Sequence, residues 1–168
     1  MNILMNIIVL IFEVLYYSMF MYYAKKEGKF KRYLLLFSLI TIIMMFTGTN
    51  SLYSYLIFVL TTLYGLKYIV KIKTSLYDML IVLIMLLFKL LIEYIIVFII
   101  YFVFGLMIAT LFMILSKTIV IFLIKDKLNI IYKKLKVKWD NNNFYIRYIF
   151  SCLTYFYIII TVISLINF

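Results

Sequence analysis

Histidine and proline are absent from this sequence, and cysteine and glycine are scarce. The chain has 168 residues, with no histidine, no proline, one cysteine and four glycines. Without histidine it can build no histidine general base, no Ser-His-Asp or Cys-His nucleophile system and no histidine metal ligand. Its only cysteine, Cys152, can form no intrachain disulfide, and its apolar surroundings favour a packing role over a nucleophilic one. No glycine-rich phosphate loop is present either, so we expect no enzyme activity, no metal site and no cofactor.

Charged residues are also few for a chain of this length. They make up 14% of the sequence, whereas 68% of the residues are hydrophobic. A soluble domain carries about 25% charged and about 45–50% apolar residues, so this chain has too little polar surface to face water on all sides. The sequence therefore predicts an integral membrane protein. We expect the lipid bilayer to be its main environment.

Long apolar runs follow one another along almost the whole chain. Because a membrane helix needs about 20 largely apolar residues, these runs predict a polytopic all-α bundle of six transmembrane helices. A polar segment, 125–143, is expected to form one further cytoplasmic interfacial amphipathic helix. The six predicted spans cover residues 3–23, 33–47, 51–70, 76–100, 106–124 and 144–168 of a single membrane domain.

The basic residues give an independent test of this arrangement. Fifteen of the seventeen lysines and arginines fall in or beside alternate connections, around residues 25–32, 67–73 and 125–147. The positive-inside rule places such connections in the cytoplasm, which predicts both termini outside. This orientation accounts for the net charge of +11, so we expect no nucleic-acid partner.

Two basic and two acidic residues lie within the predicted spans. A charge at mid-membrane costs about 2.5–3.5 kcal/mol on insertion scales, so each of these residues needs a partner. Lys89 and Glu93 are four residues apart and share one helix face, and the formal charges of the four sum to zero. We predict an intramembrane polar cluster that either fixes helix packing or serves as a ligand or switch site. It consists of Glu13, Lys89, Glu93 and Lys117.

Other polar side chains in the spans have simpler interpretations. Asp78 lies in the first turn of its predicted helix, where a carboxylate interacts favourably with the helix dipole. Tyr16 and Tyr17 lie deep in the first span, and they are expected to hydrogen-bond to neighbouring helices or to line a polar ligand pocket.

The polar segment 125–143 has helical periodicity. Apolar residues recur at spacings of three and four, and basic residues such as Lys133 and Lys134 lie around them. This pattern predicts a helix that lies flat in the inner interface and anchors the loop or docks a cytoplasmic partner. Its predicted apolar stripe is Leu128, Ile131, Leu135 and Trp139.

The layout of the chain resembles a known membrane region. Six spans, the long fourth run TSLYDMLIVLIMLLFKLLIEYIIVFIIYFVFG (74–105) and the segment LSKTIVIFLIKDKLNIIYKKLKVKW (115–139) carry the likeness. The chain resembles the membrane sensor region of accessory-gene-regulator-type (GHKL) quorum-sensing histidine kinases, over nearly all its residues. The resemblance implies the bacterial cytoplasmic membrane, an extracellular peptide ligand and signalling through a partner. It departs from that family in having no kinase domain and in ending outside after six spans.

Three functions therefore stay open at the level of sequence. The first is a non-enzymatic sensor or receptor module, perceiving a peptide or a membrane state and acting through a homodimer or a partner protein. The second is the substrate-binding membrane subunit of a vitamin-type importer, although the first span offers only Ser18 as a small residue for coupling. The third is a bacteriocin-immunity or toxin-like membrane protein.

Overall fold

The structure is a computed structural model that describes residues 3–47, 52–104, 106–140, 148, 151 and 152. Every element within these ranges is helical, which confirms the all-α fold class for the described part of the chain. The elements are α1 (Ile3–Lys25), α2 (Phe30–Thr47), α3 (Leu52–Gly65), a π-helical turn η1 (Leu66–Val70), α4 (Leu76–Phe104) and α5 (Leu106–Asp140). Most of the predicted span 144–168 lies outside the described residues.

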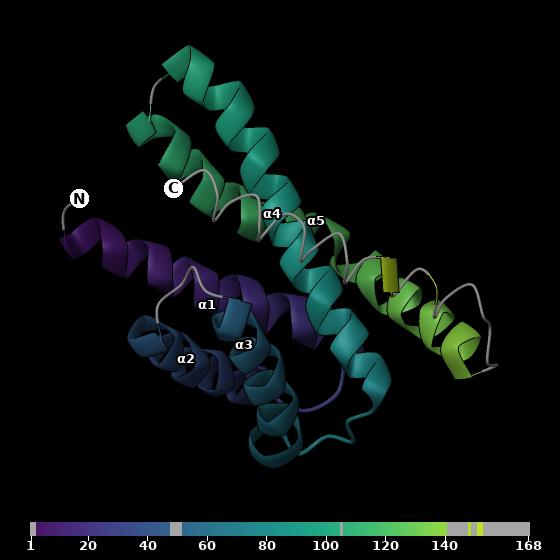
Figure 1. Cartoon of the computed structure of the whole chain (residues 1–168). Coiled ribbons are helices and arrows are strands. Elements are labelled where there is room, and N and C mark those ends of the chain that lie inside the picture. The colour runs from purple at the N-terminus through teal and green to yellow at the C-terminus, as the bar shows by residue number, and fades with distance from the viewer. Residues whose placement is uncertain (1–2, 48–51, 105, 141–147, 149–150, 153–168) are drawn as a thin grey trace.

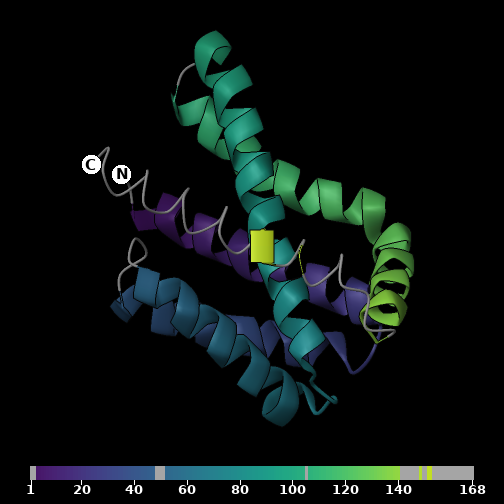
Figure 2. The ribbon, with the colours of Figure 1, turned by 45° about the vertical axis from the view of Figure 1, so that its right-hand side comes forward.

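Helix α5 differs from the sequence prediction. The predicted span 106–124 and residues 125–140 of the predicted amphipathic segment are one continuous helix of 35 residues. No proline or glycine separates the two parts, so nothing in the backbone chemistry ends the first helix before the basic segment. Figure 2 shows the axis of α5 turning along its length, so that its last, light green part runs in a different direction from its first part.

The helices pack around α1. Helix α5 packs mainly on α1 and α4, while α2 packs on α1, α3 and η1. In Figure 1, α4 crosses α1 steeply, and the α2–α3 pair lies on one side of α1. The core is formed by apolar and aromatic side chains of all five helices, including the fully buried Tyr16, Tyr33 and Phe37.

The connections after α1 and after η1 are tight turns. After α1, Lys26 and Gly28 have positive φ angles of 52° and 76°, a conformation that glycine adopts without strain. After η1, Lys71 has a φ of 63°, and the Arg32 guanidinium donates a 3.2 Å hydrogen bond to the Val70 carbonyl. The turn at the end of η1 is thereby tied to the start of α2.

The end of α3 approaches α2 very closely. A Cβ atom added to Gly65 would lie 1.9 Å from Leu36 Cδ1, and the Leu36 side chain is buried. Only a residue without a side chain therefore fits at position 65 while Leu36 keeps its place.

One helix segment among the described residues, Asn6–Lys25, is long and apolar enough to cross a membrane, and Ile57–Val70 is a shorter apolar helix. The six-span arrangement thus stays a prediction.

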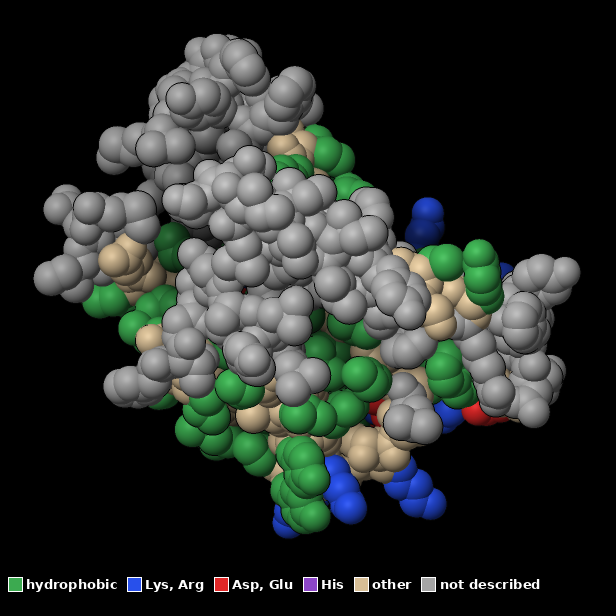
Figure 3. All heavy atoms as spheres, viewed as in Figure 1, with side chains coloured by type: hydrophobic (Ala, Val, Ile, Leu, Met, Phe, Trp, Pro, Cys, Tyr) green, Lys and Arg blue, Asp and Glu red, His purple; other side chains and the backbone are tan. Residues whose placement is uncertain are grey.

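Many large hydrophobic side chains of the described helices are exposed, among them Ile11, Met45 and Leu123. On the face shown in Figure 3, described hydrophobic side chains cover much of the lower part of the molecule, and lysine and arginine side chains project along its lower margin.

Candidate functional site: a ring of buried charges beside an apolar cavity

Glu13, Lys89, Glu93 and Lys117 come together from three helices and form a closed ring of alternating charge. Lys117 Nζ lies 2.5 Å from Glu13 Oε1 and also contacts Glu93 Oε1. Lys89 Nζ lies 2.8 Å from Glu13 Oε2 and 3.7 Å from Glu93 Oε1. We call these four residues the charge ring. Each charge has two opposite neighbours, so a site that would be costly for a single ion is electrically balanced.

The two lysines of the charge ring are not equivalent. The Lys117 side chain is 3% exposed and is held by both carboxylates. The Lys89 side chain is 22% exposed, and its contact with Glu93 is the longest in the charge ring. Lys117 is therefore the internal member of the charge ring, and Lys89 is the accessible one.

The two deep tyrosines of α1 bond to α4, as the sequence predicts. The Tyr16 hydroxyl donates a 2.8 Å hydrogen bond to the Met85 carbonyl. Lys89 donates a 3.1 Å hydrogen bond to the Tyr17 hydroxyl oxygen, and its ammonium also lies 5.5 Å from the centre of the Tyr17 ring. Tyr17 thus extends the charge ring towards α2 and α3, where its ring packs against Phe37 and Phe58.

A cavity of about 330 Å³ adjoins this side of the charge ring. Its polar wall consists of Glu13, Tyr17, Lys89 and Thr41. The rest is apolar and comes from four helices. The residues are Val9, Leu10, Met44, Met45, Phe58 and Leu86. A mostly apolar cavity with a few convergent polar groups has the make-up of a small-molecule site.

A second ionic contact lies at the other end of α1. Lys25 Nζ is 2.5 Å from Asp78 Oδ1, and both side chains are only 1% exposed. The other carboxylate oxygen, Asp78 Oδ2, accepts a 2.7 Å hydrogen bond from the backbone amide of Ser75 at the start of α4. Asp78 therefore does more than interact with the dipole of its own helix. It joins α4 to α1 through a buried ion pair.

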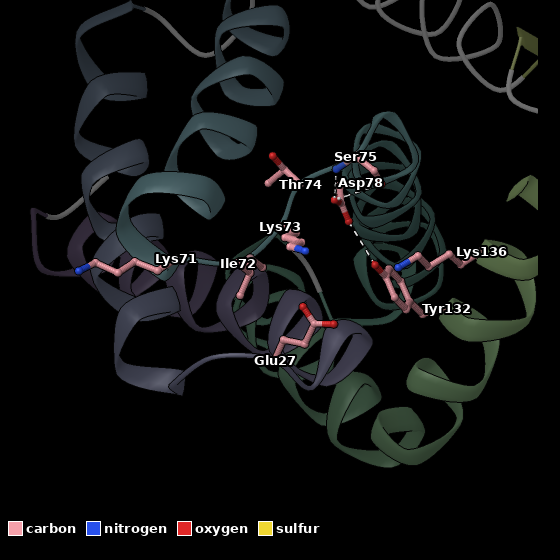
Figure 4. A pocket seen from close by; sticks show the side chains of 9 residues that line it. All are labelled: Glu27, Lys71, Ile72, Lys73, Thr74, Ser75, Asp78, Tyr132 and Lys136. Atoms are coloured by element: carbon pink, nitrogen blue, oxygen red, sulfur yellow. Dashed lines mark hydrogen bonds between the residues drawn. The ribbon is translucent and has the colours of Figure 1, made fainter.

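Tyr132 of α5 completes this second contact. Its hydroxyl donates a 3.3 Å hydrogen bond to Asp78 Oδ1, as Figure 4 shows. Burial of the phenol and the neighbouring negative charge of Asp78 raise the pKa of Tyr132 above its usual range. We call Lys25 and Asp78 the sealed pair, and Tyr132 is the tyrosine bonded to it. A separate cavity of about 380 Å³ adjoins it, with Lys73 and Lys136 on its rim.

The basic part of α5 uses a different apolar face from the predicted one. Leu128 is buried, and Leu135 and Trp139 are partly buried against the core, but Ile131 is 51% exposed. The buried position is Tyr132, whose ring packs on Tyr77 of α4. Ile131, which the sequence places in the apolar stripe, is thus exposed, whereas Tyr132, one residue further on, is buried in the protein.

This face of α5 is covered by protein. Asn129 donates a 2.8 Å hydrogen bond to the Ala24 carbonyl near the end of α1, and the Tyr77 hydroxyl donates one of 3.0 Å to the Tyr132 carbonyl. Lys133 and Lys134 are exposed.

Sequence reasoning missed Lys25, Arg32 and Tyr132. Lys25 and Arg32 lie in a basic connection, and they were interpreted only as orientation signals. A weak signal did exist in Ser75 and Asp78, which have the spacing of a helix N-terminal capping pair. Nothing local marks Lys25, 53 residues earlier in the chain, as the partner of Asp78.

The described residues contain no group of three or more acidic, histidine or cysteine side chains placed to hold a metal ion. Cys152 is a free, exposed cysteine.

Compared with protein-family models, curated proteins and solved structures, the chain matches none of them.

Proposed function

We propose that this chain is a non-enzymatic, multi-pass protein of the bacterial cytoplasmic membrane with a sensor-like function. In this proposal a ligand in the apolar cavity competes for a charge of the charge ring, and the resulting helix movement is passed to a partner protein. An extracellular peptide and a change in the membrane are both candidate stimuli, and a homodimer or another membrane or cytoplasmic protein is the candidate receiver.

The contact between the cavity and the charge ring is the observation that carries this proposal. Of the buried pair Lys25 and Asp78, only Asp78 lines a cavity, and both side chains are just 1% exposed. In the charge ring, Glu13 and Lys89 both line a cavity, so a ligand there can reach both charges directly. A ligand shifts a conformational equilibrium only if it interacts differently with the two states, and competition for an ion partner supplies such a difference.

The route from the charge ring to a partner is helix α5. It carries Lys117 of the charge ring and, fifteen positions later, Tyr132, which is hydrogen-bonded to the sealed pair. Beyond that point its exposed side bears the lysines predicted to face the cytoplasm. A change in the ion pairs of Lys117 therefore acts on the helix that presents the basic surface.

Hydrogen exchange of the full chain in lipid nanodiscs tests this route. The substitution Glu13→Gln should increase the rate of amide hydrogen exchange in residues 125–140 several-fold without loss of membrane insertion. Glu27→Gln is the matched control, because Glu27 is exposed and lies outside the charge ring. Unchanged exchange in residues 125–140 for both variants would contradict a charge switch.

Reporter fusions test the membrane arrangement. A fluorescent protein fused after Lys73 should fluoresce in the cytosol, whereas a periplasmic-type phosphatase fused after Gly105 should be active only outside. The same side for both fusion points would refute the alternating six-span topology.

The cavity also bears on the importer alternative. A substrate-binding subunit needs a cavity, but it also needs a coupling surface of small residues on the first helix, and Ser18 and Ala24 of α1 are both buried. The structure thus offers no small residue at the described surface of α1 for docking an ATPase. Co-purification with an ATPase pair would favour the importer function over the sensor function.

A further inference from the structure

The polar wall of the apolar cavity has a clear preference for one kind of ligand group. Glu13 Oε1 accepts from Lys117, and Glu13 Oε2 accepts from Lys89, so both of its oxygens are already in use. The Thr41 hydroxyl donates a 2.7 Å hydrogen bond to the Phe37 carbonyl. None of these groups therefore has a hydrogen left to donate to a ligand.

The Tyr17 hydroxyl is different. Its oxygen accepts a hydrogen bond from Lys89, but its own hydrogen has no acceptor among the described residues. A hydroxyl is both a donor and an acceptor, and a buried donor without an acceptor is costly. The cavity therefore presents one available O–H donor next to the Lys89 ammonium, and a group that satisfies both must be an acceptor, most favourably an anion.

The charge ring can release Lys89 to such an anion. If Lys89 turns towards a ligand, Glu13 and Glu93 still share Lys117, which contacts both of them. A cationic ligand would have the opposite effect. It would displace Lys89 from Glu13, and only the 3.7 Å contact with Glu93 would then remain for the Lys89 ammonium. The geometry of the charge ring thus tolerates an added anion better than an added cation.

The remaining wall and the size of the cavity set the body of the ligand. Apart from the polar groups above, the lining is aliphatic, thioether or phenyl, and about 330 Å³ lies at the lower end of the range of about 300–1,000 Å³ for ligand sites. Met45 is highly exposed and also lines the cavity, so the cavity reaches the molecular surface beside α2.

We propose that this cavity binds a small amphiphile with a terminal carboxylate, which accepts hydrogen bonds from Tyr17 and Lys89 while its apolar chain contacts α2 and α3. The inference rests on the proposed function, because it names the ligand of the same cavity. Two sources share this chemistry. One is a medium-chain fatty acid, to which we assign the site, and the other is the free C-terminus of a short apolar peptide.

Equilibrium binding to the full chain in phosphatidylcholine nanodiscs tests the proposal, with the signal from empty nanodiscs subtracted. The probes are octanoate, octan-1-ol and octylamine, which differ only in the terminal group. Octanoate is expected to bind about tenfold more tightly than either of the others, because only the carboxylate makes charge-assisted hydrogen bonds with both donors. Equal affinities, or tighter binding of octylamine, would overturn the proposal.

The variant Tyr17→Phe removes the hydroxyl and keeps the ring that packs on Phe37 and Phe58. It should weaken octanoate binding about tenfold and octan-1-ol binding by a smaller factor, because the hydrogen bond to a carboxylate is the stronger one. Tyr64→Phe is the matched control, because Tyr64 is exposed and lies outside the cavity, and it should bind octanoate like the parent. An equal loss in both variants would overturn the role of Tyr17.

An apolar tetrapeptide with a free or an amidated C-terminus separates the two sources. Binding of octanoate but of neither peptide supports the fatty-acid assignment. Binding of the free-acid peptide without octanoate overturns that assignment in favour of a peptide carboxylate. If no carboxylate binds while Glu13→Gln still alters exchange in residues 125–140, the ligand class is wrong and the proposed switch stands.

Discussion

The charge ring and the sealed pair use the same chemistry at two places along α1, but they differ in access. Lys25 and Asp78 are both almost fully buried, and each carboxylate oxygen of Asp78 has a hydrogen-bond donor from the protein. The charge ring has more charges and weaker enclosure, with Lys89 and Glu13 at a cavity wall. Both sites border a cavity, but only the carboxylate of the sealed pair does so, whereas an anion and a more exposed cation of the charge ring both line theirs.

The largest effect is expected from breaking the sealed pair. Asp78→Ala leaves the Lys25 ammonium buried without its partner, and it should lower the free energy of unfolding by about 3–5 kcal/mol. The measurement is denaturant-induced unfolding in bicelles. A double variant, Lys25→Met with Asp78→Leu, removes both charges and should recover most of the loss. A loss of less than about 1 kcal/mol in the free energy of unfolding for Asp78→Ala would show that the pair does not hold the helices together.

The two lysines of the charge ring should differ in the same measurement. Lys117→Met leaves two carboxylates with only Lys89 between them, so it should cost about 3 kcal/mol. Lys89→Met removes the more exposed lysine and leaves both carboxylates on Lys117, so about 1 kcal/mol is expected. The reverse order would contradict the assignment of Lys117 as the internal member.

Tyr132→Phe should have a smaller effect on the sealed pair. Losing its hydrogen bond to Asp78 should cost about 1 kcal/mol. The pKa of Tyr132 is raised in the folded state, so the phenol's contribution is complete below the ordinary tyrosine pKa of about 10. That contribution is lost as the pH rises from there towards the folded-state pKa. Unfolding measured between pH 8 and 11 should therefore show a shallower alkaline decline for Tyr132→Phe than for the parent. Parallel pH profiles would argue against this coupling.

The smallest effect is expected at Ile131, on the exposed side of α5. Ile131→Ala should change the free energy of unfolding by less than about 0.5 kcal/mol. Leu128→Ala, three residues earlier on the buried face, is the matched comparison and should cost about 2 kcal/mol. Similar costs at the two positions would mean that the buried face of α5 is assigned to the wrong residues.

The helices themselves could be predicted closely from the sequence. Runs of apolar residues between basic turns located α1 to α4 to within a few residues, because helix formation there depends on local composition. The boundary between the predicted fifth span and the amphipathic segment could not be found in this way. Polarity changes at residue 125, but nothing in the backbone chemistry ends a helix there.

The charge ring was predictable because isolated charges in apolar helices must find one another. This cost argument identified all four of its members, although it gave neither the order of contacts nor the cavity. The sealed pair was not predictable in the same way, since Lys25 lies at a helix end where a lysine is ordinarily solvated. Likewise, Tyr132 was left out of the predicted apolar stripe because a periodicity count of aliphatic residues selects Ile131.

The contact between Gly65 and Leu36 has a consequence for how this fold can change in evolution. Aliphatic residues elsewhere in the core can replace one another at nearly constant volume, so they retain little trace of ancestry. At positions 36 and 65 the added Cβ and the leucine methyl group would occupy the same space. Divergent descendants that keep this helix crossing are therefore expected to retain glycine at 65, or to gain a side chain there only together with a smaller residue at 36.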